Sequence, residues 1–122
     1  MVEKEITLES PTDTRFGYCN TNYAMLALII EKVTGLKYPE AMKEMIFAPL
    51  GMTDTFVFDI AKDRDIIAPS YKGNNVEIGI DYLDGIYGDK NIYSTPRDLL
   101  KFDKARYAPF FLNPDLLKKV YT

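Results

Sequence analysis

Two side chains that could do chemistry stand two residues apart in the segment FGYCNTNYA, residues 16–24. Tyr18 carries a phenol and Asn20 a carboxamide, at the point where a polar loop gives way to the most apolar run of the chain. At the start of a helix, both side chains can face a cleft. A structural explanation also fits, because asparagine is a favoured helix N-cap and an aromatic residue before it can pack on the first turn. The residues alone leave both interpretations open.

Other reactive side chains carry weaker signals. Cys19 is more typical of a small buried hydrophobe than of a nucleophile. Asp81, Asp84 and Asp89 could bind a cation, but their spacing matches no calcium loop and aspartates among glycines are common in turns. With one cysteine and no histidine, the chain can form neither an internal disulfide nor a zinc or iron site of the usual kind. We therefore expect neither a metal nor a cofactor.

Composition narrows the class of protein. The chain has 122 residues, of which 47% are hydrophobic and 27% charged, as in one ordinary globular domain or a piece of a larger one. Its net charge is -3, with 15 basic and 18 acidic residues intermixed, so no basic stripe is present to follow nucleic acid. We expect no membrane segment, because no apolar run is long enough and the first residues lack the apolar core of a signal peptide. The compartment is left unassigned.

The elements that must position Tyr18 and Asn20 begin with an apolar helix. The pattern predicts this helix from about Asn20 to Thr34, with Gly35 as its C-terminal stop. Eight successive apolar residues run from position 23 to position 30, so the helix requires burial on most sides. If parts of this surface stay uncovered, we expect self-association through Met25, Leu28, Ile29 or their neighbours.

A second helix is predicted to start at Pro39, which suits the first helical position, and to end at PLGM, residues 49–52. Its apolar residues share one face: Ala41, Met42, Met45 and Ile46. Residues 56–93 show little helical period, and the stretches FVF and VEIGI are compatible with short strands or ordered loops.

Two more helices are signalled near the end of the chain. In STPRDLLKFDKARY, Thr95 can cap the helix, Pro96 takes the first position, and the Asp98 carboxylate is expected to meet the unpaired amides of the first turn. Asn113 and Pro114 predict the start of a last short helix. It carries Leu116, Leu117 and Val120.

These patterns together predict a mainly helical chain, with an α+β arrangement left open. Residues 1–15 are expected to form an extended arm with a turn, and residues 16–122 a single domain. No internal repeat or low-complexity linker divides the chain.

Two long stretches resemble one known family. The segment YCNTNYAMLALIIEKVTGLKYPEAMKEMIFAPLGMTDT and the later GDKNIYSTPRDLLKFDKA are similar, in this order, to serine beta-lactamase-related proteins, which include class C beta-lactamases, penicillin-binding proteins and D-alanyl-D-alanine peptidases. The resemblance covers roughly residues 16–107. It implies the helical region of the beta-lactamase fold, and relatives that are often periplasmic or secreted.

The resemblance implies acyl transfer by a serine nucleophile on an amide or ester, including beta-lactams and peptides. The family uses Ser-x-x-Lys, Tyr-x-Asn and Lys-Thr-Gly, and only the second is present, as Tyr18-Cys19-Asn20. None of the serines is followed by lysine three residues later, and KVTG at residues 32–35 fits a helix end. We therefore expect an inactive central fragment of a serine hydrolase. The alternative is a non-catalytic binding or assembly module that retains part of the fold.

Roles for the two motif residues follow from the same resemblance. Tyr18 would accept or relay the proton of the nucleophile, which requires ammonium groups beside the phenol. Asn20 would offer its amide to the carbonyl of a small-molecule or peptide substrate and orient it. The loop GDKN departs from relatives, since Lys90 and Asn91 replace expected glycines. Asparagine tolerates left-handed backbone and lysine does so poorly, so the conformation of this loop is left open.

Overall fold

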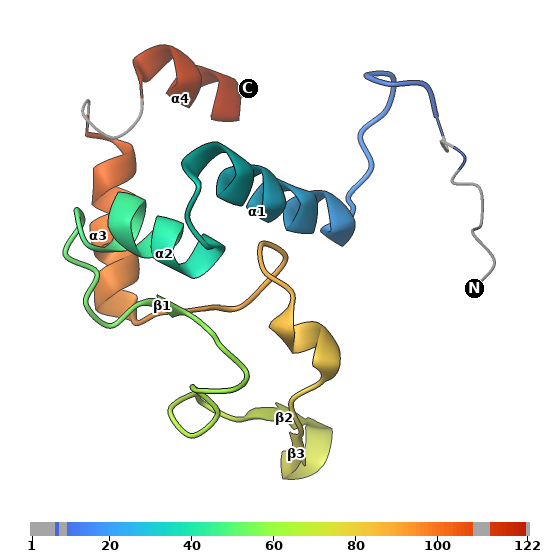
Figure 1. Ribbon diagram of the computed structural model, residues 1–122, viewed down its shortest axis with the longest axis vertical. Helices are drawn as coiled ribbons and strands as arrows, with labels where there is room; N and C mark the ends of the chain where they lie inside the picture. The colour runs from blue at the N-terminus through green and yellow to red at the C-terminus, as the bar shows by residue number, and fades with distance from the viewer. Residues whose placement is uncertain (1–6, 8–9, 109–112, 122) are drawn as a thin grey trace.

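The computed structural model describes Thr7, residues 10–108 and residues 113–121. In this part of the chain, helices are packed beside two small, separate sheets (Figure 1). The α-helices are α1 (Asn20–Thr34), α2 (Tyr38–Met42), α3 (Pro96–Arg106) and α4 (Pro114–Tyr121). Much of the expected arm, residues 1–6, 8 and 9, lies outside the described residues.

Both sheets are antiparallel pairs of short strands. β1 (Phe56–Val57) pairs with β4 (Ile92–Tyr93), so that the Phe56 and Tyr93 rings stack with centroids 5.8 Å apart. β2 (Ser70–Lys72) and β3 (Val76–Ile78) form a hairpin. The structure is 46% helical with 11% strand, so the prediction of a mainly helical chain is wrong and the class is mixed α and β. Strands of two or three residues are too short to show an alternating pattern in the sequence.

The predicted bounds of α1 are confirmed. It runs from Asn20 to Thr34, and Gly35 ends it in the left-handed conformation with a φ of 71°. The Gly35 amide donates to the Glu31 carbonyl at 2.9 Å, which satisfies one of the last carbonyl groups of the helix. The KVTG segment is therefore a helix end, as the sequence indicates.

α2 starts at Tyr38, one residue before the predicted Pro39, and continues into a wide π-helical turn at Lys43–Phe47. In this turn the Ala48 amide donates to the Lys43 carbonyl at 2.8 Å, five residues back. The predicted apolar face exists. All of its residues line a groove of about 410 Å³ against the second half of α1: Ala41, Met42, Met45 and Ile46.

α3 begins as predicted, with Pro96 first and the Thr95 hydroxyl accepting from the Asp98 amide at 3.3 Å. The Asp98 carboxylate does not meet the amides of its own helix, in contrast to our expectation. It turns away and is fully buried against the loop that precedes β1. In α4, the Asn113 side chain accepts from the Asp115 amide at 2.9 Å, as its role at the helix start predicts.

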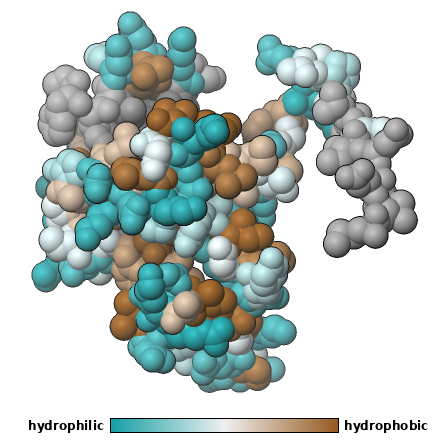
Figure 2. Space-filling view, viewed as in Figure 1, coloured by the Kyte–Doolittle hydropathy of each residue, from teal (hydrophilic) through white to brown (hydrophobic). Residues whose placement is uncertain are grey.

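A small core joins α1, α2 and β1. Its buried residues are Ala27, Tyr38, Phe47, Met52 and Val57. On α1 itself much apolar surface is left uncovered in this chain, and Val33 is 80% exposed. Apolar patches accordingly interrupt the polar surface in the region of α1 (Figure 2). Within the described residues, no helix combines the length and the apolar character that crossing a membrane requires.

Candidate functional site

The start of α1 places Asn20 inside the helix and Cys19 at its cap. Cys19 has extended backbone, with φ -147° and ψ 117°, and its carbonyl accepts from the Asn22 amide at 3.1 Å. No side chain caps this helix end. The interpretation of Asn20 as the N-cap is therefore wrong, because the chain turns into the helix one residue earlier.

Tyr18 lies on the surface beside the first turn of α1. It is 68% exposed, and its ring packs at a centroid distance of 5.5 Å against the ring of Tyr23. Packing of an aromatic residue on the helix start is thus present. The packing leaves the phenol in solvent, where it can still meet a substrate or another part of a larger protein. The Cys19 thiol is exposed as well, in contrast to the expected buried hydrophobe.

Asn20 lines a cavity of about 370 Å³ at the start of α1. The other lining residues come from the next turn of α1, from the 3₁₀ turn Tyr82–Gly85 and from the loop before β4: Thr21, Ala24, Leu83, Ile86, Asp89 and Lys90. The structure thus brings Asn20 together with a carboxylate and an ammonium group that are about seventy residues away in the sequence. Tyr18 is not part of this cavity wall.

The loop at GDKN is held against α1 by a glycine. Gly88 has a φ of 89°, and a Cβ atom placed on it would lie 2.3 Å from the Tyr23 carbonyl oxygen and 3.0 Å from Ala27 Cβ. Only a residue without a side chain allows this close approach. Gly88 therefore fixes the distance between the helix that carries Asn20 and the loop that carries Asp89 and Lys90.

The backbone conformation of the same loop depends on Asn91. This residue adopts a φ of 85°, while Lys90 has no left-handed backbone, so the residue that tolerates this conformation is the one that carries it. The Asn91 carboxamide is buried and donates to the Asp84 backbone carbonyl, and the backbone carbonyl of Asn91 accepts from the Phe58 amide at 2.7 Å. Asn91, which stands where a glycine is expected, therefore holds the loop in place through these two hydrogen bonds.

The three aspartates that the sequence analysis weighed as cation ligands and favoured as turn residues have different surroundings in the structure. Asp81 accepts from the Leu83 amide at 3.1 Å, and Asp84 accepts from the Asp81 amide at 2.7 Å. The hydrogen bond from the Asp81 amide, together with Lys90, lowers the pKa of Asp84. Asp84 forms an ion pair of 3.0 Å with Lys90, whose pKa is raised mainly by this contact. Among the described residues, no group of three metal-binding side chains is brought together.

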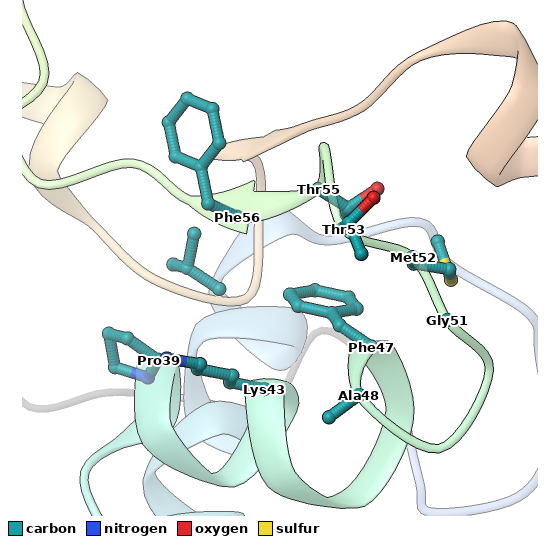
Figure 3. A pocket seen from close by; sticks show the side chains of 10 residues that line it. Pro39, Lys43, Phe47, Ala48, Gly51, Met52, Thr53, Thr55 and Phe56 are labelled. Atoms are coloured by element: carbon teal, nitrogen blue, oxygen red, sulfur yellow. The ribbon is translucent and has the colours of Figure 1, made fainter.

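The serines lie elsewhere. Ser94 Oγ is 2.8 Å from Thr55 Oγ1, behind the start of α3, and Ser70 belongs to β2 beside a different cavity. Neither they nor Ser10 line the Asn20 cavity. A larger cavity of about 600 Å³ lies between α2 and β1, where the Phe47 ring lies below the segment that leads through Thr55 into Phe56 of β1 (Figure 3). This second cavity is mostly apolar and contains none of the predicted site residues.

Comparison with known proteins identifies the family. The family model described as Beta-lactamase matches residues 4–119, and the chain therefore belongs to the beta-lactamase family. It is 32% identical over 114 residues to penicillin-binding protein 4* of Bacillus subtilis (strain 168), covering 79% of this chain and 25% of that protein. It is 34% identical over 105 residues to the teichoic acid D-alanine hydrolase of Staphylococcus aureus, covering 80% and 26%.

A solved relative supports the same assignment. The D-amino acid amidase from Ochrobactrum anthropi SV3 superposes with a TM-score of 0.66 at 30% identity, over 85% of this chain and 33% of that chain. The family resemblance read from the sequence is confirmed, and the homologues include hydrolases of the beta-lactamase and penicillin-binding group. The chain spans about a quarter of the length of the curated relatives and a third of the amidase.

Proposed function

We propose that this chain supplies one wall of an acyl-transfer site in a serine hydrolase that cleaves an amide or an ester. In this site Asn20 donates its amide to the substrate carbonyl, and Tyr18 takes part in transferring the proton of the nucleophile. A serine outside these residues attacks the carbonyl, an acyl-enzyme forms, and water or an amine releases the acyl group. Residues 16–122 then form one partial domain of the enzyme.

The main support for this proposal is that the Asn20 side chain makes no interaction that stabilises the fold. It neither caps α1 nor hydrogen-bonds to any described residue, and it faces a cavity with polar groups. A carboxamide in such a position is available to a ligand, because its donor and acceptor are both unused by the protein. The exposed phenol of Tyr18 two residues earlier supports the same function.

By itself the chain is proposed to be inactive. It contains no Ser-x-x-Lys, and none of its serines lies on the Asn20 cavity. The names of the D-amino acid amidase and the teichoic acid D-alanine hydrolase support a hydrolytic reaction on a D-amino acid derivative. We therefore select D-alanine amides and esters as the first substrates to test, with beta-lactams as acylating probes.

Sequencing the gene on both sides of this segment tests the proposal. An upstream Ser-x-x-Lys and a downstream Lys-Thr-Gly or His-x-Gly are expected, since the reaction needs a nucleophile, a lysine and a strand that borders the cleft. Stop codons close to both ends would contradict the hydrolase. They would support instead a non-catalytic binding or assembly module that keeps part of the fold.

We also propose that the isolated chain self-associates through α1. Met25, Leu28 and Ile29 are each more than half exposed, beside the apolar groove between α1 and α2. Covering apolar surface is favourable by about 25 cal/mol per Å², so a few hundred Å² contribute several kcal/mol. Sedimentation velocity over a hundredfold concentration range is expected to show growing species.

The double substitution Leu28→Lys and Ile29→Lys is expected to keep the chain monomeric over this concentration range. Val76→Lys, at a similarly exposed apolar residue on β3, is the matched control and is expected to associate like the unmodified chain. If the unsubstituted chain were monomeric at every concentration, the proposed self-association through α1 would be contradicted.

A further inference from the structure

Of the three aspartates at and after the turn that borders the cavity of Asn20, only Asp89 lines the cavity, and the other two carboxylates are used by the structure. The Asp81 carboxylate accepts from the Leu83 amide, and that of Asp84 accepts from the Asp81 amide and pairs with Lys90. No described residue donates a hydrogen bond to the carboxylate of Asp89, which is half-buried on the cavity wall. Asp89 is thus the carboxylate at this site that is available to a ligand.

The negative charge of Asp89 on the cavity wall is not balanced by the positive charge beside it. Lys90 is the ammonium group on this wall, and Asp84 already holds this group at 3.0 Å. The Asp84 carboxylate is the main cause of the raised pKa of Lys90, with smaller contributions from Asp89 and Asp81, so negative charge exceeds positive charge next to the cavity. A concave site with an excess of negative charge attracts cationic ligands and disfavours anionic ones.

The remaining wall of the cavity is small and aliphatic. Ala24, Leu83 and Ile86 contribute apolar surface, while Asn20 contributes the carboxamide. A ligand that fits this arrangement has a carbonyl for Asn20, a short aliphatic side chain for the apolar wall and a positive group for Asp89. Amides and esters of small amino acids with an unblocked α-amino group have all three.

We propose that Asp89 selects substrates with a free α-ammonium group, by pairing with this group while Asn20 holds the acyl carbonyl. The inference rests on the proposed function, because it assigns the substrate class of the same cavity. Substrates whose α-amino group is acylated, or replaced by a hydroxyl group, lose the ion pair and bind more weakly. Since the site is open to solvent, the preference decreases at high salt.

Nuclear magnetic resonance titration of the chain tests this selection. D-Alaninamide is the cationic probe, and D-lactamide, with a hydroxyl group in place of the ammonium group, is its neutral counterpart. We expect both to shift the side-chain amide signals of Asn20, with D-alaninamide binding about threefold to fivefold more tightly, as for one ion pair at a partly exposed site. Asp89→Asn is expected to abolish this preference.

The control is Asp65→Asn, which removes one negative charge from an exposed residue outside the cavity and is expected to retain the preference. Equal binding of the two probes, or a preference that survives in Asp89→Asn, would overturn the role of Asp89 and leave the proposed acyl-transfer site intact. Absence of any shift at Asn20 with either probe would overturn both. Circular dichroism verifies that each variant folds.

Discussion

Asp98→Ala is expected to destabilise the chain more than any other single substitution in α3. The Asp98 carboxylate is fully buried and accepts from the Asp54 amide at 2.8 Å, from the Thr55 hydroxyl at 2.9 Å and from the Lys101 ammonium group at 2.7 Å. The same ammonium group donates to the Gly51 carbonyl. Alanine removes the acceptor for all three donors and leaves buried polar groups without partners.

Thr95→Ala is the matched comparison, because it removes only the N-cap of the same helix and is expected to cost about 1 kcal/mol. Urea unfolding of both variants measures the difference in the free energy of unfolding. Asp98→Asn is expected to be less destabilising than Asp98→Ala, since one carboxamide oxygen can still accept from the Asp54 amide and the Thr55 hydroxyl, whereas the amide nitrogen cannot accept from Lys101. Equal stability of Asp98→Ala and Thr95→Ala would contradict the central role of this carboxylate.

The same carboxylate predicts a dependence of stability on pH. The hydrogen bond from Lys101 lowers the pKa of Asp98 most, the Asp54 amide and the Thr55 hydroxyl lower it further, and burial opposes them. Because the folded-state pKa lies below the unfolded value of about 3.9, the stabilisation is complete above that value and is lost as pH falls through the folded-state pKa. Asp98→Asn should flatten the loss of stability below about pH 4, measured by thermal unfolding.

Gly88→Ala is the second substitution with a large expected effect. At a φ of 89°, its Cβ would lie 2.3 Å from the Tyr23 carbonyl oxygen, a backbone atom that cannot move without displacing α1. The strained backbone and this overlap together are expected to cost about 3 kcal/mol or more, or to release the loop from the helix. Release would separate Asn20 from Asp89 and Lys90 and open the cavity.

Two other glycines separate the contributions. Gly35→Ala shares the left-handed backbone, with a φ of 71°, but its Cβ meets nothing within 4 Å, so it measures the cost of the backbone alone. Gly79→Ala has neither feature and is expected to change stability by less than about 0.5 kcal/mol. If Gly88→Ala were no more destabilising than Gly35→Ala, the close approach of the loop to α1 would be refuted.

The features that the sequence predicts well are those with local causes. Gly35 ends α1 and Thr95 caps α3 because a glycine or a hydroxyl group acts on amides within a few residues. The pairing of β1 with β4 and the contact of Asp98 with Asp54 join segments far apart in the chain, and no short pattern reports them. The sequence therefore predicts most helix ends correctly but misses the strand pairing, and this is why the predicted fold class is wrong.

The candidate site shows the same division. The Tyr-x-Asn motif located Asn20, but the N-cap interpretation failed because the extended backbone of Cys19 shifts the cap by one residue. The sequence indicates Asp89 only as one of three aspartates in turns, and Lys90 only as the replacement of an expected glycine. Their place beside Asn20 depends on the close contact of Gly88 with α1, which is a tertiary contact. The unusual GDKN segment is the feature of the sequence that points to this loop, and the structure places the loop at the cavity of Asn20.

We propose that this chain holds the Tyr18 and Asn20 part of an acyl-transfer site without its nucleophile. Intact-protein mass spectrometry after incubation with labelled penicillin tests it most directly, because acylation of a serine adds one probe mass to each chain. We expect an unchanged mass, together with hydrolysis of D-alanine p-nitrophenyl ester at the rate of buffer alone. A stoichiometric adduct on Ser10, Ser70 or Ser94 would contradict it.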